Sequence, residues 1–210
     1  MNDFLEKKFK HMRLEPGLFY EWPIGLRFEL GTDAKKEHYY PGSPYLNEAY
    51  KRALTLFEEI HPPDEEIWIV MDVHRYSGRV KEGNVRMWKT LVRDHKLLYR
   101  LKHTKLPYYI PEDDESGNWR THRWVLPCKP SDVHYHRLLT SLVEQDMGFS
   151  NVDYRSIYFV HPKNGTIFHV YDDRGCDIVA ASRETIRPIY ESFNDWILDY
   201  DREAIDEVFN

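Results

Sequence analysis

Apolar residues recur along this chain at two spacings, which together predict both helices and strands. The clearest helix covers residues 43–60, where apolar positions fall on one face, Ser43 suits the N-cap and Pro44 suits the first turn. Residues 24–30 alternate apolar and polar side chains, which predicts a half-buried strand. The unbroken apolar run Ile67–Met71 predicts a central strand that is covered on both faces.

The other elements follow from the same patterns. We expect helices over 3–13, 85–102 and 131–147, a strand over 120–128, a loop over 107–118, and two acidic C-terminal helices, the first capped by Ser182. Helices and strands are mixed without a repeating βαβ order, and the hairpins come late. The sequence therefore predicts an α+β fold with a mixed or antiparallel sheet. We expect one domain over 1–210, with 1–110 and 120–210 as the alternative division.

Residues 156–181 form the most distinctive segment and predict a three-stranded meander with two tight turns. Asn164-Gly165 suits the first turn, because this pair tolerates positive φ angles. In the second turn, which spans 171–175, we expect the leading aspartate to cap backbone amides and Arg174 to pair with a carboxylate. Gly175 is predicted to be left-handed. Adjacent carboxylates in a turn diverge, so this segment favours a structural turn or a binding epitope over an acid–base pair.

Longer stretches of the chain resemble a known family. HVYDDRGCDIVA and ETIRPIYESFNDWILDYDREAIDEVF strongly resemble the C-terminal signature of an uncharacterised family of soluble proteins in Gram-positive bacteria, which has only a domain-of-unknown-function label. FYEWPIGLRFELG, YLNEAYKRALTLFEEI and KLLYRLKHTKLPY look like the same family, so the resemblance covers nearly the whole chain. It implies one soluble domain, with no established chemistry and no catalytic residues to transfer.

A second likeness concerns the style of the turn and not ancestry. A strand, a YDDRG-type turn and another strand also occur in small α+β immunity proteins of bacterial toxin systems. Those proteins neutralise a toxin, often a basic nuclease, through an acidic face. The likeness is an analogy of fold, which is weak support for function.

Charge is distributed unevenly along the chain, although the net charge is only −6. Residues 75–105 hold ten Lys or Arg against two acidic residues, whereas residues 172–210 hold eleven Asp or Glu against four Arg. This asymmetry indicates either two opposed surfaces or an internal contact in which the basic segment faces the acidic C-terminal helices.

The first functional hypothesis is a non-enzymatic protein-binding module, such as an immunity protein that neutralises a basic toxin. An acidic face would steer a basic partner towards the turn at 171–175. The predicted binding residues are Asp172, Asp173, Arg174, Asp177, Asp199, Asp201 and Glu203.

The alternative hypothesis is a protein that binds nucleic acid or another polyanion through residues 75–105. The aromatic residues Tyr76, Trp88 and Tyr99 interleave the positive charges, and this combination can hold phosphates and stack bases. The predicted binding residues are Arg86, Lys89, Arg93, Lys96, Arg100 and Lys102.

An enzyme is the third and least favoured hypothesis. A hydrolytic site would use His134, His136 and Asp173, and a metal would need Cys128 or His122 as a further ligand. The sequence has no CxxC, HExxH or GxSxG motif, and it predicts neither a metal nor a cofactor.

The cellular compartment is predicted from two kinds of apolar segment that are not seen in the sequence and from the two cysteines. No apolar run approaches the roughly 18 residues that a membrane span needs, and the N-terminus has no signal-like apolar stretch. Cys128 and Cys176 are expected to be free and buried. These features predict a cytoplasmic protein without a membrane partner, and they leave its oligomeric state open.

Overall fold

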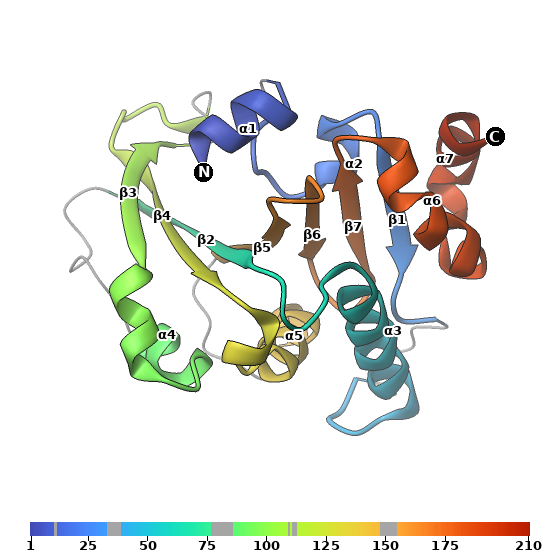
Figure 1. Ribbon diagram of the computed structural model, residues 1–210, viewed down its shortest axis with the longest axis horizontal. Helices are drawn as coiled ribbons and strands as arrows, with labels where there is room; N and C mark the ends of the chain where they lie inside the picture. Colours follow the sequence, from blue (N-terminus) through green and yellow to red (C-terminus); the bar gives the residue numbers. More distant parts are fainter. Residues whose placement is uncertain (11, 33–38, 77–85, 109, 111–112, 148–154) are drawn as a thin grey trace.

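The computed structural model describes residues 1–10, 12–32, 39–76, 86–108, 110, 113–147 and 155–210, which form a seven-stranded sheet with helices around it (Figure 1). Every pair of neighbouring strands is antiparallel. The strands lie in the order β1 (Gly25–Glu29), β7 (Gly175–Ala180), β6 (Thr166–Val170), β5 (Arg155–His161), β2 (Ile67–Tyr76), β4 (Trp119–Cys128) and β3 (Lys102–Pro107). The predicted meander is β5–β6–β7.

The helices complete an α+β fold, as predicted. They are α1 (Asn2–Lys8), α2 (Leu18–Glu21), α3 (Pro44–Ile60), α4 (Arg86–Leu91), α5 (Tyr135–Val143), α6 (Arg183–Ser192) and α7 (Arg202–Phe209). Short 3₁₀ turns are η2 (His95–Arg100), η4 (Pro130–Asp132), η5 (Gln145–Met147), η6 (Asn194–Trp196) and η7 (Asp199–Asp201). Within the described ranges, no helix has both the length and the apolar character that crossing a membrane requires.

Two apolar cores cover the two faces of the sheet. The larger core joins α3, α4, α5, α6 and α7 to one face, and the smaller core joins α1 and the apolar residues Met12, Leu14 and Leu18 to the other face. In β2, Ile67, Ile69 and Met71 enter the larger core, while Val70 enters the smaller one. The prediction that this strand is central and covered on both sides is therefore confirmed.

The helix caps show one confirmed prediction and one error. The Ser43 hydroxyl oxygen accepts a hydrogen bond from the Leu46 backbone N–H at 3.2 Å and caps α3. Ser182 holds the N-cap position of α6 but makes no capping hydrogen bond with its side chain. Its hydroxyl donates instead to the Glu184 carboxylate.

The predicted helix over 85–102 is wrong in its second half. α4 ends at Leu91, and a new 3₁₀ turn starts where the Asp94 carboxylate accepts the Lys96 backbone N–H at 2.9 Å. From Lys102 the chain becomes extended because β3 pairs along β4. The predicted loop over 107–118 accordingly begins after the strand end at Pro107.

Two other helices are shorter than predicted. The helix over 3–13 ends at Lys8, after which Phe9 packs edge-on against Trp22 at 5.1 Å between ring centroids. The helix predicted over 131–147 is a regular α-helix only in α5, because Val133 is extended and forms an antiparallel bridge with Val92 between η4 and α5.

The basic and acidic segments lie at opposite edges of the sheet. β3 forms one edge and is flanked by α4 and η2, whereas β1 forms the other edge and is flanked by α6 and α7 (Figure 1). An antiparallel bridge between Phe28 and Ile197 ties β1 to the acidic C-terminal segment. The interpretation that the basic segment faces the acidic helices is therefore wrong, and the charges form two opposed surfaces.

Candidate functional site

The turn between β6 and β7 is held together by its own side chains. The Asp172 carboxylate accepts hydrogen bonds from the Arg174 backbone N–H at 2.8 Å and from Arg174 Nε at 2.9 Å. Asp173 points elsewhere and accepts a hydrogen bond from the Tyr45 hydroxyl at 2.5 Å. Burial is the largest cause of the raised pKa of Asp173. The cap, the Arg174 pairing and the divergence of the two carboxylates are as predicted.

Gly175 has a different role from the predicted left-handed turn residue. It is the first residue of β7, and it is not among the described glycines with positive φ. A Cβ atom on Gly175 would lie 2.0 Å from the Tyr171 hydroxyl and 2.6 Å from the Phe28 carbonyl oxygen. The position therefore needs glycine because two neighbours approach closely. The other predicted glycine turn is confirmed, since Gly165 has φ 70°.

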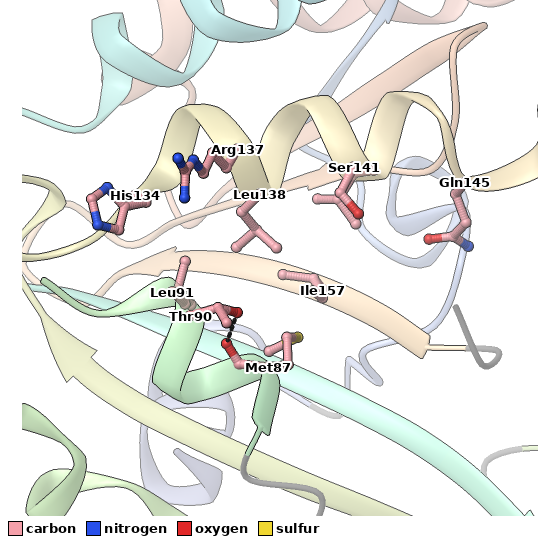
Figure 2. Close-up of a pocket in the computed structure, with 10 residues that line it drawn as sticks. Met87, Thr90, Leu91, His134, Arg137, Leu138, Ser141, Gln145 and Ile157 are labelled. Carbon is pink, nitrogen blue, oxygen red and sulfur yellow. Dashed lines mark hydrogen bonds between the residues drawn. The ribbon is translucent and has the colours of Figure 1, made fainter. Parts of the chain in front are cut away.

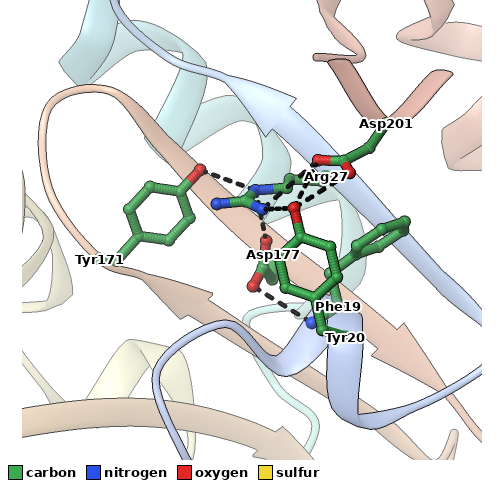
Figure 3. Close-up of polar contacts among 6 residues, drawn as sticks. All are labelled: Phe19, Tyr20, Arg27, Tyr171, Asp177 and Asp201. Atoms are coloured by element: carbon green, nitrogen blue, oxygen red, sulfur yellow. Dashed lines mark hydrogen bonds and ion pairs between the residues drawn. The ribbon is translucent and has the colours of Figure 1, made fainter. Parts of the chain in front are cut away.

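An arginine on edge strand β1 is the centre of a polar network that joins four segments (Figure 3). Arg27 Nη1 donates to the Tyr20 hydroxyl at 2.6 Å and lies 3.4 Å from an Asp201 carboxylate oxygen. Arg27 Nε donates to the Tyr171 hydroxyl at 3.3 Å. The Tyr20 hydroxyl in turn donates to Asp201 at 3.0 Å. The network thus connects α2, β1, the turn before β7 and the start of α7.

Asp177 is the buried anion of the same network. It is fully buried, with one carboxylate oxygen 3.6 Å from Arg27 Nε and the other accepting the Phe19 backbone N–H at 3.3 Å. Burial raises the pKa of Asp177 to about 6, and the Arg27 charge and the Phe19 N–H limit that rise. Burial alone would lower the pKa of Arg27, but the groups around its guanidinium raise it above the usual value.

The predicted acidic binding set is therefore divided between the interior and the surface. Asp172, Asp173, Asp177 and Asp201 are buried and have internal partners, so they do not form an open acidic face. Arg174, Asp199 and Glu203 remain exposed. The side chain of Asp199 is 95% exposed and lies 3.2 Å from Arg202.

The exposed acidic surface is a shallow depression along α7 and the turn before it. It is lined by Asp199, Arg202, Glu203, Asp206, Glu207 and Asn210. Arg202 turns inward, where it donates to the Asn194 side-chain oxygen at 3.0 Å and to the Ile197 carbonyl at 3.2 Å. Tyr200, which follows Asp199 in the chain, is 86% exposed. This arrangement leaves acidic groups and one aromatic ring facing the solvent.

The predicted basic set is almost entirely on the surface. Arg86, Lys89, Arg93, Lys96 and Lys102 are exposed, whereas Arg100 is half-buried and lies 2.6 Å from a Glu66 carboxylate oxygen. Within the described residues, Lys89, Arg93, Lys96, Lys102 and the neighbouring Lys105 form no ion pair.

Of the three interleaved aromatic residues, one lies openly among these cations. Tyr99 is 86% exposed, Tyr76 is half-buried, and Trp88 is fully buried in the core. Trp88 therefore has a structural role, which corrects its place in the predicted base-stacking set. The surface signal that remains is a group of cations around one exposed ring.

The sequence patterns did not reveal a pair of imidazoles on the same edge of the sheet. His103 Nε2 lies 3.0 Å from His122 Nδ1, and the planes of the two rings are parallel to within 3°. Trp124 stacks against His103 at 4.5 Å. Lys105 sits directly opposite His122 in the strand register. The pair forms because β3 lies antiparallel to β4, and the sequence patterns predicted no strand over 103–106.

The residues of the enzymatic hypothesis are not brought together. His136 lies 3.7 Å from Glu58, Asp173 bonds to Tyr45, and His122 pairs with His103. Cys128 is a buried free thiol on β4, as is Cys176 on β7. Across the part of the chain that the structure describes, no group of three or more His, Cys, Asp or Glu side chains is arranged to hold a metal.

The fold and its surfaces define a class: an antiparallel α+β protein with oppositely charged ends. Comparison with known families makes this more specific. The chain belongs to the family described as Domain of unknown function (DUF3885), whose model matches residues 1–201. It is also 26% identical over 206 residues to a Bacillus subtilis (strain 168) protein called Uncharacterized protein YnaE, which covers 94% of this chain and 96% of that protein. The resemblance that the sequence motifs indicated is confirmed. No solved structure matches the chain.

Proposed function

We propose that this protein is a non-enzymatic binding module whose basic end binds a polyanion such as nucleic acid. The basic end consists of the exposed cations on α4, η2, β3 and the turn between α4 and η2: Arg86, Lys89, Arg93, Lys96, Lys102 and Lys105. One observation carries the proposal. Five of these cations form no ion pair within the described residues, although the chain as a whole is acidic.

The contrast with the acidic end explains why the basic end is preferred. Four acidic candidates are buried and make internal contacts, whereas every basic candidate except Arg100 is exposed to solvent. Cations without carboxylate partners are free to neutralise phosphates and release counterions, which is the main source of affinity for nucleic acids. Asp94 and Asp132, which line a depression together with Arg93 and Lys96, accept backbone N–H groups, Asp94 from Lys96 and Asp132 from Lys129.

Aromatic rings add a second contribution to the same surface. Tyr99 lies between Lys96 and Lys102 in the chain and is almost fully exposed. The imidazole pair of His103 and His122 lies next to Lys105 on the neighbouring strands. Rings of this kind stack on bases of any sequence, so we expect single strands to bind more tightly than duplex.

The test is fluorescence anisotropy with labelled single-stranded DNA, single-stranded RNA and duplex DNA. We expect affinity to fall as salt rises from about 50 to 200 mM, because each neutralised phosphate contributes a slope of roughly −0.7 on single strands. Lys89→Glu combined with Lys96→Glu should abolish binding without changing the thermal midpoint. The matched control reverses two exposed lysines elsewhere, Lys7→Glu and Lys51→Glu, and should bind like the wild type.

Two results would contradict the proposal. One is no retention of any of these nucleic acids, or of heparin, at low salt. The other is an equal loss of affinity in the two double variants, because that would show that net charge, and not this surface, determines binding.

A second candidate function rests on the acidic depression along α7. Its exposed carboxylates and Tyr200 suit a basic protein partner, as in the immunity-protein hypothesis.

Affinity capture followed by mass spectrometry tests this second candidate. One stoichiometric basic protein should remain bound after nuclease treatment, and it should no longer be captured by the variant Asp199→Lys combined with Glu203→Lys. The control Glu59→Lys with Asp64→Lys should retain that protein. An identical set of captured proteins from both variants would reject this candidate.

Both candidates share a proposed compartment. We place the protein in the cytoplasm, because its two cysteines are free thiols, which suits a reducing environment.

A further inference from the structure

A cavity of about 160 Å³ lies between α4 and α5, away from the acidic network (Figure 2). Leu91, Leu138, Leu142 and Ile157 give it apolar walls, and all four are buried. Figure 2 shows Leu138 and Ile157 facing one another across this space. An engineered dry cavity of similar volume in another protein holds one benzene molecule, so this space suits an apolar body of about six carbons.

The rim of the cavity is polar and positive on the α5 side. His134 and Arg137 line it together with Ser141 and Gln145, and the cavity has no acidic residue among its described lining. Arg137 is exposed and forms no ion pair within the described residues.

The surroundings of His134 are positive and favour the neutral form of its ring. Burial is the largest cause of the lowered pKa of His134, and the nearby positive charges of Arg93 and Arg137 lower it further. The mouth of the cavity therefore brings His134 and Arg137 together, and no carboxylate is found among the described residues that line it.

We propose that this cavity binds a small amphipathic carboxylate, with its acid group on Arg137 and His134 and its apolar body among Leu138, Leu142 and Ile157. A ligand with an acid group and an apolar body matches both the polar rim and the apolar walls of the cavity. Apolar walls favour a hydrocarbon body, and an arginine at the rim favours a carboxylate over a neutral or cationic head. The site is separate from polyanion binding, because a cavity of this size does not admit a polymer chain and Arg137 is not part of the basic end.

The first test compares three probes that have the same hydrocarbon chain: hexanoate, 1-hexanol and hexylammonium. Titration followed by methyl NMR should shift the signals of Leu138, Leu142 and Ile157. We expect hexanoate to bind at least about tenfold more tightly than hexanol, because its carboxylate gains one charge-assisted hydrogen bond and such a bond accounts for an affinity ratio of about this size. Hexylammonium should bind more weakly than either. A bound carboxylate should also raise the pKa of His134, because a nearby anion favours the protonated ring.

Variants then test the polar rim and the apolar space of the site separately. Arg137→Gln should weaken hexanoate by about tenfold and leave hexanol unchanged, whereas Arg183→Gln, at an exposed arginine on α6, should change neither. Ser141→Trp should block both probes by filling the mouth. If that variant does not fold, Arg137→Gln decides alone.

Three outcomes would overturn the proposal. They are equal affinity for hexanoate and hexanol, unchanged hexanoate affinity in Arg137→Gln, and methyl shifts centred on the smaller core around Val70 and Val160. These outcomes are independent of nucleic-acid binding, since Lys89→Glu with Lys96→Glu should leave the hexanoate affinity within about twofold.

Discussion

The two edges of the sheet use charge in opposite ways. At the β1 edge, Asp177 and Asp201 are drawn into the interior around Arg27, and the network connects segments that are far apart in the chain. At the β3 edge, the cations point into solvent and most have no carboxylate partner within the described residues.

The comparison shows that a local excess of charge in a sequence has two different physical meanings. A carboxylate that is buried beside an arginine contributes to the fold, and losing its partner leaves an uncompensated charge in a medium of low dielectric constant. A cation in solvent contributes little to stability, because water and salt screen it. Only the second kind is available to a ligand.

The largest expected effect comes from removing the central cation of the acidic end. Arg27→Met should lower the free energy of unfolding by about 3–5 kcal/mol, because Asp177 and Asp201 then stay buried without a cation. Urea denaturation at neutral pH measures this change. Arg93→Met, the same substitution at the basic end, should stay within about 0.5 kcal/mol. Similar losses of unfolding free energy in the two variants would contradict the proposed difference between the two edges.

A smaller effect concerns the pH dependence of Asp177. Its folded pKa of about 6 lies above its ordinary value, so the folded state holds this proton more tightly than the unfolded chain does. The stability contributed by this group is therefore present at low pH and is lost as pH rises through about 6.

Asp177→Asn removes the carboxyl group that titrates, so comparison with the wild type measures its contribution to the free energy of unfolding. Relative to the wild type, the variant should gain roughly 2–3 kcal/mol between pH 4 and pH 7. Paired urea denaturation curves across that range cancel the other titrations, including those of His61 and His169, whose pKa values burial lowers to about 3 and about 4. A difference that does not change with pH would show that Asp177 is not the buried anion described above.

The smallest expected effect is at the basic end. Lys89→Gln combined with Lys96→Gln should change the free energy of unfolding by no more than about 0.5 kcal/mol, with a slight gain at low salt because like charges are removed. Thermal unfolding at low and high salt measures it. A clear loss of stability would mean that these lysines have structural partners.

Local patterns predicted the parts of the fold that depend on near neighbours. The cap and apolar face of α3, the apolar run of β2 and the Asn164-Gly165 turn are all set within a few residues. The helix predicted over 85–102 was wrong after Leu91, because Val133, which is distant in the chain, forms a bridge with Val92, and the Asp94 cap then starts a 3₁₀ turn.

The internal role of the acidic residues was hidden for the same reason. Arg27 and Asp177 are 150 positions apart in the sequence, so no local pattern connects them. A signal did exist: Asp177 interrupts the apolar run of a predicted strand, whereas Arg27 takes a polar position in the alternating strand over 24–30. A charged residue inside a buried strand indicates a buried partner of opposite sign, and that pairing would have removed Asp177 from the predicted surface set.

Separating the charges to opposite edges of one sheet makes the molecule a strong electric dipole. Its moment runs along the sheet from the acidic helices beside β1 to the basic strand β3. In a dilute buffer, such a molecule turns in the field of any charged surface before it touches that surface. Two copies that meet end to end attract each other, whereas two that meet with like ends repel. Raising the ionic strength screens both the orienting field and the attraction between opposite ends.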